Sequence, residues 1–285
     1  MRAAAVFSLI AAAPGAGATA IAQEPGLGDG NYGGGAVLAS PRSIYGAGNM
    51  LIGLRFSGGR LLINVGMRLS CAEDAVFSAR ARPDADGSFR VAGTSVSGAV
   101  RTRYVVKGLI AAGSARGTAS ARTSITRRGR ATRCPPSKVR WQARRASGET
   151  AIAPAAPKER MFGTTSQRLN GPRRAIALRL SSDGTKLARA LYDVTVRCGR
   201  RTITDTFDAP KRNLLIAADG SVRDVERFTF SDRRTVYRSI ERFTATIGSA
   251  GARGTFSTVA RIADRRSGRT LLRCRSGTVR WSAST

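Results

Sequence analysis

The chain has 285 residues, no histidine, and a formal net charge of +30 from 48 basic and 18 acidic side chains. The lack of histidine excludes Ser-His-Asp triads and metal sites built on histidine. A genome biased toward alanine, glycine and arginine codons is the preferred explanation of this charge. The alternative is an anionic partner such as a wall polymer, an acidic polysaccharide, nucleic acid or a membrane surface.

The N-terminus has the layout of a secretory signal peptide, which we predict over residues 1–22. Arg2 precedes an apolar run, and small residues follow as far as Ala20, Ile21 and Ala22. The run is too short to anchor the chain in a bilayer, and no later stretch has the apolar length of a membrane helix. A buried apolar segment of an ordinary domain is the alternative. We therefore expect a secreted, extracellular protein with no membrane span in its mature form.

The rest of the chain contains the same series of landmarks twice. A Leu-Arg pair, a cysteine, an Asp-Gly-Ser segment, an Ala-Arg-Gly-Thr (ARGT) segment and a second cysteine recur in one order, and a tryptophan lies seven positions beyond each second cysteine. Such a series indicates an internal duplication, and two copies are too few for a solenoid. We predict two domains, residues 31–143 and 161–285, joined by a linker at residues 144–160 that is rich in alanine, proline and charged residues.

Alternation of apolar and polar residues predicts β-strands in both copies. Every second residue from Leu61 to Cys71 is apolar or cysteine, and the same holds from Tyr192 to Cys198. This period of two places each first cysteine on the core face of a half-buried strand. Turn residues follow at short intervals, so we expect an all-β fold of two tandem antiparallel β-sandwich domains, jelly-roll or Ig-like. A true immunoglobulin domain differs in that its tryptophan lies between its two cysteines.

The four cysteines predict disulfides and therefore an oxidising compartment. Of the three possible pairings, only Cys71–Cys134 together with Cys198–Cys274 keeps each bridge within one copy. A zinc site is the alternative, but the chain has no closely spaced pair of cysteines and no histidine. We expect one disulfide in each domain, and neither a metal nor another cofactor.

Two short motifs predict turns. The Asp-Gly pairs at residues 86–87 and 219–220 lie between apolar runs and lack the spaced acidic ligands of a calcium loop. The ARGT segments at residues 115–118 and 252–255 lack the further glycines and the following helix of a phosphate-binding loop. We interpret each ARGT segment as a turn that leads into a strand.

The segments CPPSKVRW and CRSGTVRW begin at Cys134 and Cys274 and carry Pro-Pro or Ser-Gly soon after the cysteine. These signals predict a hairpin in which the cysteine ends one strand and the tryptophan lies in the last strand. Trp141 and Trp281 alternate with valine and alanine, which favours a place in the core over a carbohydrate-stacking surface.

The landmarks resemble a known repeat. The segment FGTTSQ (Phe162–Gln167), the Leu-Arg strand, ADGS, ARGT and the closing C-x-SG-x-V-x-W-x-A pattern are similar to a repeat of largely uncharacterised secreted proteins of actinobacteria. The resemblance covers nearly all of the second copy. In the first copy it is partial, because YGGGAVLAS does not reproduce GTTSQ. The resemblance implies export and a small all-β fold, and it assigns no catalytic or binding residue.

An enzyme is the first functional class to weigh. If all four cysteines are bridged, none is available as a nucleophile, and no G-x-S-x-G elbow occurs. A secreted carbohydrate-active enzyme would need a pair of carboxylates, whereas scattered acids are usually solvated. No convergent catalytic site emerges, so we expect no enzymatic activity. The candidate carboxylates of the second copy are Asp193, Asp205, Asp208, Asp219 and Glu226.

The preferred class is a secreted binding or structural protein that attaches to an anionic cell-wall polymer or polysaccharide through outward arginines. The charge is spread evenly, at +14 over residues 31–143 and +15 over residues 161–285, and only 17 aromatic residues occur. The even charge supports the third class, a cationic nucleic-acid-binding protein, only weakly, and the scarcity of aromatic residues argues against it. The arginines expected to contact anions are Arg68, Arg140, Arg197 and Arg280.

Overall fold

The computed structural model describes residues 27–36, 49–68, 74–127, 130–145, 155–209 and 213–285. The predicted signal peptide, the middle of the predicted linker and Cys71 lie outside these ranges. Within them every regular element is a β-strand, so the all-β prediction is confirmed. The described ranges contain no helix with the length and apolar character needed to cross a membrane.

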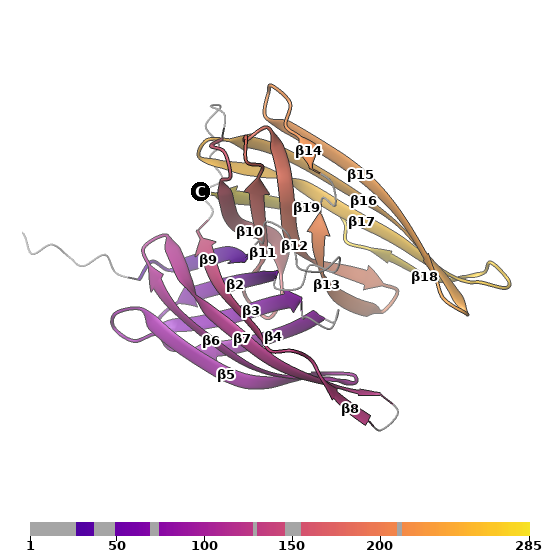
Figure 1. Ribbon diagram of the computed structural model, residues 1–285, viewed down its shortest axis with the longest axis horizontal. Helices are drawn as coiled ribbons and strands as arrows, with labels where there is room; N and C mark the ends of the chain where they lie inside the picture. The colour runs from indigo at the N-terminus through magenta and orange to yellow at the C-terminus, as the bar shows by residue number, and fades with distance from the viewer. Residues whose placement is uncertain (1–26, 37–48, 69–73, 128–129, 146–154, 210–212) are drawn as a thin grey trace, which may run out of the picture.

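The first half of the chain forms a single antiparallel sheet that curls into a nearly closed barrel (Figure 1). Its strands are β1 (Gly30–Ala36), β2 (Met50–Ser57), β3 (Arg60–Arg68), β4 (Asp74–Ala81), β5 (Ser88–Ser97), β6 (Val100–Ala111), β7 (Ser114–Arg127), β8 (Arg130–Arg133) and β9 (Ser137–Arg144). The order is β4-β3-β2-β1-β9-β7-β6-β5, and β8 pairs with β7. The two edges approach each other where the Ser95 hydroxyl of β5 donates to the Val76 carbonyl of β4 at 3.1 Å.

The second half forms a closed barrel. Its strands are β10 (Arg160–Arg168), β11 (Arg173–Leu180), β12 (Lys186–Cys198), β13 (Arg201–Ala209), β14 (Leu214–Leu215), β15 (Ser221–Ser231), β16 (Thr235–Gly248), β17 (Gly251–Asp264), β18 (Thr270–Arg275) and β19 (Val279–Ser284). The order is β13-β12-β11-β10-β19-β17-β16-β15, and β14 pairs with β12. Because β18 pairs with both β12 and β17, the sheet joins into a ring.

The strand order is the same in both halves when β14 is set aside. Most consecutive strands pair as in a meander, although β4 and β5 lie at opposite ends of the first order and β13 and β15 at opposite ends of the second. The first strand of each half pairs with its last, β1 with β9 and β10 with β19. Each half is therefore one curled sheet. The jelly-roll or Ig-like sandwich is not confirmed, because those folds need Greek-key connections between two separate sheets. The internal duplication and the domain limits of 31–143 and 161–285 remain predictions.

Curling turns one face of each sheet into a barrel interior that side chains fill. Successive side chains of a strand lie on opposite faces, so alternate residues point inward. The interior of the first barrel includes Tyr32, Leu54 and Trp141, and that of the second includes Tyr192 and Trp281. Trp141 and Trp281 expose only 1% and 4% of their surface, which confirms that both belong to the core.

The ARGT segments are not turns, contrary to the prediction. They lie within β7 and β17, just beyond the turns that precede these strands. Gly117 pairs directly with Trp141, and Gly254 pairs directly with Trp281. A Cβ atom on either glycine would lie 2.7 Å from the Cζ2 atom of the opposite tryptophan. The glycine thus provides space for the indole ring, which is a packing requirement rather than a turn signal.

The predicted hairpin after the second cysteine is also wrong. Both β8 and β9 pair with β7, one after the other, so the chain keeps its direction past Pro135 and Pro136. In the second half, β18 and β19 pair with β17 in the same way. The prolines, like Ser276 and Gly277, interrupt the ladder without reversing the chain, because proline removes a backbone donor but tolerates an extended conformation.

Both Asp-Gly pairs form the predicted turns. Gly87 and Gly220 have φ values of +83° and +76°, a conformation that favours glycine. The carboxylates of Asp86 and Asp219 accept hydrogen bonds of 2.8 Å from the backbone N–H groups two residues further on. The pKa of the Asp86 carboxyl is lowered by hydrogen bonds from the backbone and then the side chain of Ser88. The pKa of the Asp219 carboxyl is lowered by hydrogen bonds from the side chain and then the backbone of Ser221.

Cys198 of β12 and Cys274 of β18 form a disulfide, as predicted. They are also direct ladder partners at the seam where β18 closes the barrel against β12. In the first half Cys134 is buried and disulfide-bonded. Its expected partner Cys71 lies outside the described residues, so the bridge between the two remains a prediction.

The two barrels pack against each other through the outer faces of β1 and β2 on one side and of β10 and β11 on the other (Figure 1). A Cβ atom on Gly33 would lie only 1.7 Å from the carbonyl oxygen of Gly163, so glycine lets the two backbones approach closely. This contact positions the two halves around a groove. The buried apolar residues of the contact between the barrels are Leu51, Phe162, Ala175, Ala177 and Leu191.

Replacing Cys198 and Cys274 together by alanine should lower the free energy of unfolding by about 4.5 kcal/mol in the chain-entropy model. The bridge closes a loop with a sequence separation of 76 in the unfolded chain. Urea denaturation of the oxidised variant and the oxidised wild type measures the difference. Equal denaturation midpoints would contradict the assignment of this bridge as the closure of the barrel.

Gly254→Ala should lower the free energy of unfolding by about 1–3 kcal/mol, because overpacking a filled core forces side chains and backbone to shift. The added Cβ would meet Trp281 at 2.7 Å and the Thr244 carbonyl at 1.9 Å. Ser257→Ala in the same strand is the control, with an expected change below about 0.5 kcal/mol. If both variants unfold at the same urea concentration, the glycine is not a packing requirement.

Candidate anion-binding site

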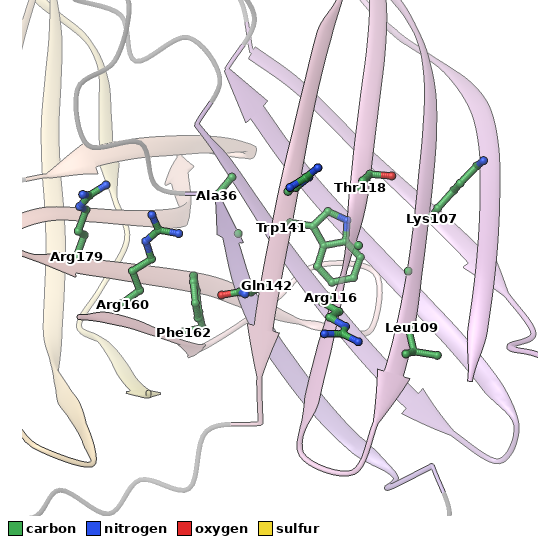
Figure 2. A pocket seen from close by; sticks show the side chains of 14 residues that line it. Ala36, Lys107, Leu109, Arg116, Thr118, Trp141, Gln142, Arg160, Phe162 and Arg179 are labelled. Carbon is green, nitrogen blue, oxygen red and sulfur yellow. The ribbon is translucent and has the colours of Figure 1, made fainter. Parts of the chain in front are cut away.

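A groove of about 870 Å³ lies beside the contact between the two barrels. One wall is the outer face of β6, β7 and β9 in the first barrel, and the other is formed by β10 and β11 of the second (Figure 2). The volume falls within the range of ligand-binding pockets. Both halves of the chain are therefore needed to form the groove.

Five of the described residues that line the groove are cations, and none of the described lining residues is acidic. Lys107, Arg116 and Arg140 come from the first barrel, and Arg160 and Arg179 come from the second. Each alternates along its strand with residues of the barrel interior, so each projects from the outer face. A cleft lined by one sign of charge focuses the electric field and attracts counter-ions. The groove is therefore a candidate site for anionic groups.

Arg160 and Arg179 are direct cross-strand partners in the ladder between β10 and β11. Figure 2 shows their guanidinium groups on the same wall. Like charges at directly opposed positions destabilise a sheet. Partial burial, and after it the charge of Arg160, lower the pKa of the Arg179 guanidinium. An anion between the two would remove this repulsion and could accept a pair of hydrogen bonds from each guanidinium.

The remaining lining residues determine what the groove can do. Phe162 and Trp141 border it, but they expose only 4% and 1% of their surface, so neither offers a ring face to a sugar or a base. Thr118 and Gln142 add a hydroxyl and an amide. A hydroxyl without an adjacent base is a weak nucleophile. The arrangement is thus suited to holding phosphate, sulfate or carboxylate groups.

Of the four arginines predicted to contact anions, only Arg140 lines this groove. Arg280 occupies the matching place before the tryptophan of β19 and lines a separate hollow on the second barrel. Arg68 ends β3, and Arg197 is the penultimate residue of β12. The structure therefore does not bring the four predicted arginines together in one site.

The other four cations of the groove were not among the predicted contacts. Arg116 belongs to the ARGT landmark and Arg179 to the Leu-Arg landmark, so alternation with core residues could have placed both on the outer face. Arg160 ends the predicted linker, and Lys107 lies in a strand with no landmark. These cations come together because of the way the two barrels pack, and alternation in the sequence does not predict that packing.

The carboxylates considered for a glycosidase are dispersed. Asp193 is buried, and its Oδ2 atom lies 3.4 Å from a guanidinium nitrogen of Arg174. Asp219 belongs to an exposed turn. The side chains of Asp205 and Asp208 lie outside the described part of the molecule. Among the described candidates, none lines the cationic groove.

Glu226 lies elsewhere, on the inner side of β15, directly opposite Glu241 of β16. The prediction had not included Glu241. Both lie close to Tyr192, whose hydroxyl has a pKa raised chiefly by burial and further by these carboxylates and Asp224. Among the described residues, no group of three or more histidine, cysteine or acidic side chains is arranged to hold a metal ion.

No family model matches the chain, and no characterised protein or solved structure is significantly similar to it. The functional assignment therefore depends on the charge and geometry of the groove.

Arg160→Gln should raise the free energy of unfolding by roughly 0.2–1 kcal/mol at low salt, because it removes a directly opposed pair of like charges. The gain should shrink as salt is added, since ions screen exposed charges. Arg227→Gln is the matched control, because the ladder partner of Arg227 is the uncharged Ile240. Urea denaturation measures both variants, and a less stable Arg160→Gln protein would contradict the repulsion.

Proposed function

We propose that this protein is an exported, non-catalytic binding module that holds an anionic cell-surface polymer, a wall polymer or an acidic polysaccharide, in the groove between its two barrels. One observation carries the proposal. Among the described residues, five cations from both halves and no acidic side chain line the groove, and two of the cations, Arg160 and Arg179, directly oppose each other.

An extended polymer fits this site better than a single small anion. The cations are distributed over two walls instead of converging on one point, and Figure 2 shows Arg179 and Lys107 on opposite sides of the groove. A chain with repeated carboxylate, phosphate or sulfate groups can meet several of them at once. Arginine suits each of these groups because its planar fork bonds two oxygens.

Export is supported by three features. The N-terminal sequence has the layout of a signal peptide, the Cys198–Cys274 disulfide is compatible with an oxidising compartment, and the landmarks resemble a repeat of secreted actinobacterial proteins. An extracellular location would place the groove among cell-surface polymers.

Two competing functions receive less support. A nucleic-acid-binding surface commonly adds aromatic rings on which bases stack, whereas the rings that border the groove are buried. A carbohydrate-active enzyme requires two carboxylates that flank the scissile bond, and none is among the described residues that line the groove.

The test is binding of the oxidised protein to four immobilised polymers at low and at physiological salt. The polymers are polygalacturonate, poly(glycerol phosphate), neutral dextran and duplex DNA. We expect saturable binding to a carboxylate or phosphodiester polymer, weakening with salt, and none to dextran. Replacing Arg140, Arg160 and Arg179 together by glutamine should weaken this binding roughly tenfold or more, because each exposed ion pair contributes up to about 1 kcal/mol.

The control removes the same charge elsewhere, with Arg233, Arg234 and Arg266 replaced by glutamine. These three arginines are exposed and lie in or beside the loops at the far end of the second barrel. An equal loss of polymer binding in the two triple variants would mean that binding depends on the net charge and not on the groove. Preferential binding to DNA at physiological salt would replace the proposal with nucleic-acid capture.

A further inference from the structure

A row of four residues crosses the outer face of each barrel at the same place. In the second barrel, Arg223, Thr244, Thr255 and Arg280 are successive ladder partners on β15, β16, β17 and β19. The corresponding row of the first barrel crosses β5, β6, β7 and β9, and its members are Arg90, Lys107, Thr118 and Arg140. Both rows begin and end with arginine and have threonine in the third place.

The landmarks of the two copies create these rows. Within ARGT, the alanine and the glycine face the barrel interior and the arginine and the threonine face outward, because side chains alternate along a strand. The arginine before each tryptophan faces outward for the same reason. The residues that let Trp281 pack inside therefore also place Arg253, Thr255 and Arg280 together on the outer face.

The two rows differ in what covers them. In the first barrel, Lys107, Thr118 and Arg140 form part of the groove, and the second barrel provides the opposite wall. In the second barrel, the row lines a hollow of about 550 Å³ on the outer face, to which Arg253 also contributes. No acidic side chain is among the described residues that line this hollow.

We infer that this hollow, built on Arg223, Arg253 and Arg280, is a second binding site for the same anionic polymer, so that one chain holds the polymer at two places. The inference rests on the proposed function of the groove. It extends that function by assigning a second site and a valence of two.

The spacing of the row fits successive groups of a polymer. Neighbouring strands lie about 4.8 Å apart, so the backbones that carry Arg223 and Arg280 are separated by about 14 Å across three strand spacings. Where both side chains extend outward, successive charged groups of an extended polyanion can meet both arginines. Between them, the hydroxyl oxygens of Thr244 and Thr255 lie 2.9 Å apart and provide an uncharged, polar surface.

Two sites on one chain also change the strength of attachment. Once one segment of a polymer is bound, a second segment of the same molecule reaches the other site at a high effective concentration. Binding to a long polymer should therefore exceed the affinity for a short fragment, without any additional contact. Surface attachment would benefit from this avidity.

The test is the number of short linear polyphosphate chains bound per protein molecule, measured by isothermal titration calorimetry on the full oxidised chain at low salt. We expect two for the wild type and one after Arg223, Arg253 and Arg280 are replaced together by glutamine. The groove variant, with Arg140, Arg160 and Arg179 replaced, should also bind one. The control variant at Arg233, Arg234 and Arg266 should keep two.

The outcomes separate this inference from the proposed function. If the Arg223, Arg253 and Arg280 variant still binds as many chains as the wild type, the second site is wrong while the groove can stand. If the groove variant keeps the wild-type number while the Arg223, Arg253 and Arg280 variant loses one chain, the groove is wrong and the second site stands. A uniform decrease in all three variants overturns both. Near-ultraviolet circular dichroism of the tryptophans confirms that each variant is folded.

A second titration identifies the chemistry of the polymer. Short oligogalacturonates supply carboxylates, and short poly(glycerol phosphate) chains supply phosphodiesters. The polymer of the ligand's class should bind at both sites near physiological salt. It should lose one site in the groove variant and one in the Arg223, Arg253 and Arg280 variant. Binding of both polymers at the groove alone would overturn the valence of two.

Discussion

Each barrel depends on one contact, between the tryptophan of its last strand and the glycine of its ARGT segment. Because Gly117 and Gly254 lie directly opposite Trp141 and Trp281, the indole ring can extend across the neighbouring strand. The contact fixes the register of the last strand, since a slip by one residue would turn the tryptophan to the outer face. The register in turn decides which side chains face outward, including Arg280.

This arrangement concentrates positive charge on the outer faces. Acidic residues are too few to neutralise it, and arginines meet directly across ladders, as Arg160 meets Arg179 and Arg103 meets Arg122. A large net charge destabilises a compact state by self-repulsion, so these pairs do not contribute to the stability of the fold. The filled barrels and the disulfide at the seam of the second barrel offset that repulsion. A role in binding anions gives a reason for tolerating it, since binding sites often reduce stability.

Local patterns predicted the features that depend on a single strand or turn. The strands, the inward-facing tryptophans, the two Asp-Gly turns and the Cys198–Cys274 bridge follow from alternation and from the repeated landmarks. The sandwich was not confirmed, because alternation has the same period in a curled sheet as in two packed sheets. The ARGT turn and the hairpin after Cys274 were wrong, because glycine and proline serve packing and ladder breaks as well as turns. The groove could not be predicted, because its walls come from two halves that meet through Gly33 and Gly163.

The two halves are not interchangeable, and the difference lies in the groove. The pair Asn31 and Arg55 of the first sheet occupies the same place in the ladder as Arg160 and Arg179 of the second. Asn31 accepts a hydrogen bond of 3.4 Å from the backbone of Arg173 in the contact between the barrels, where a second arginine would add charge to a close interface. Arg160 instead faces the open side of the contact and completes the cationic wall. The equivalent position is thus asparagine in the first barrel, where it joins the two barrels, and arginine in the second, where it is suited to binding a ligand.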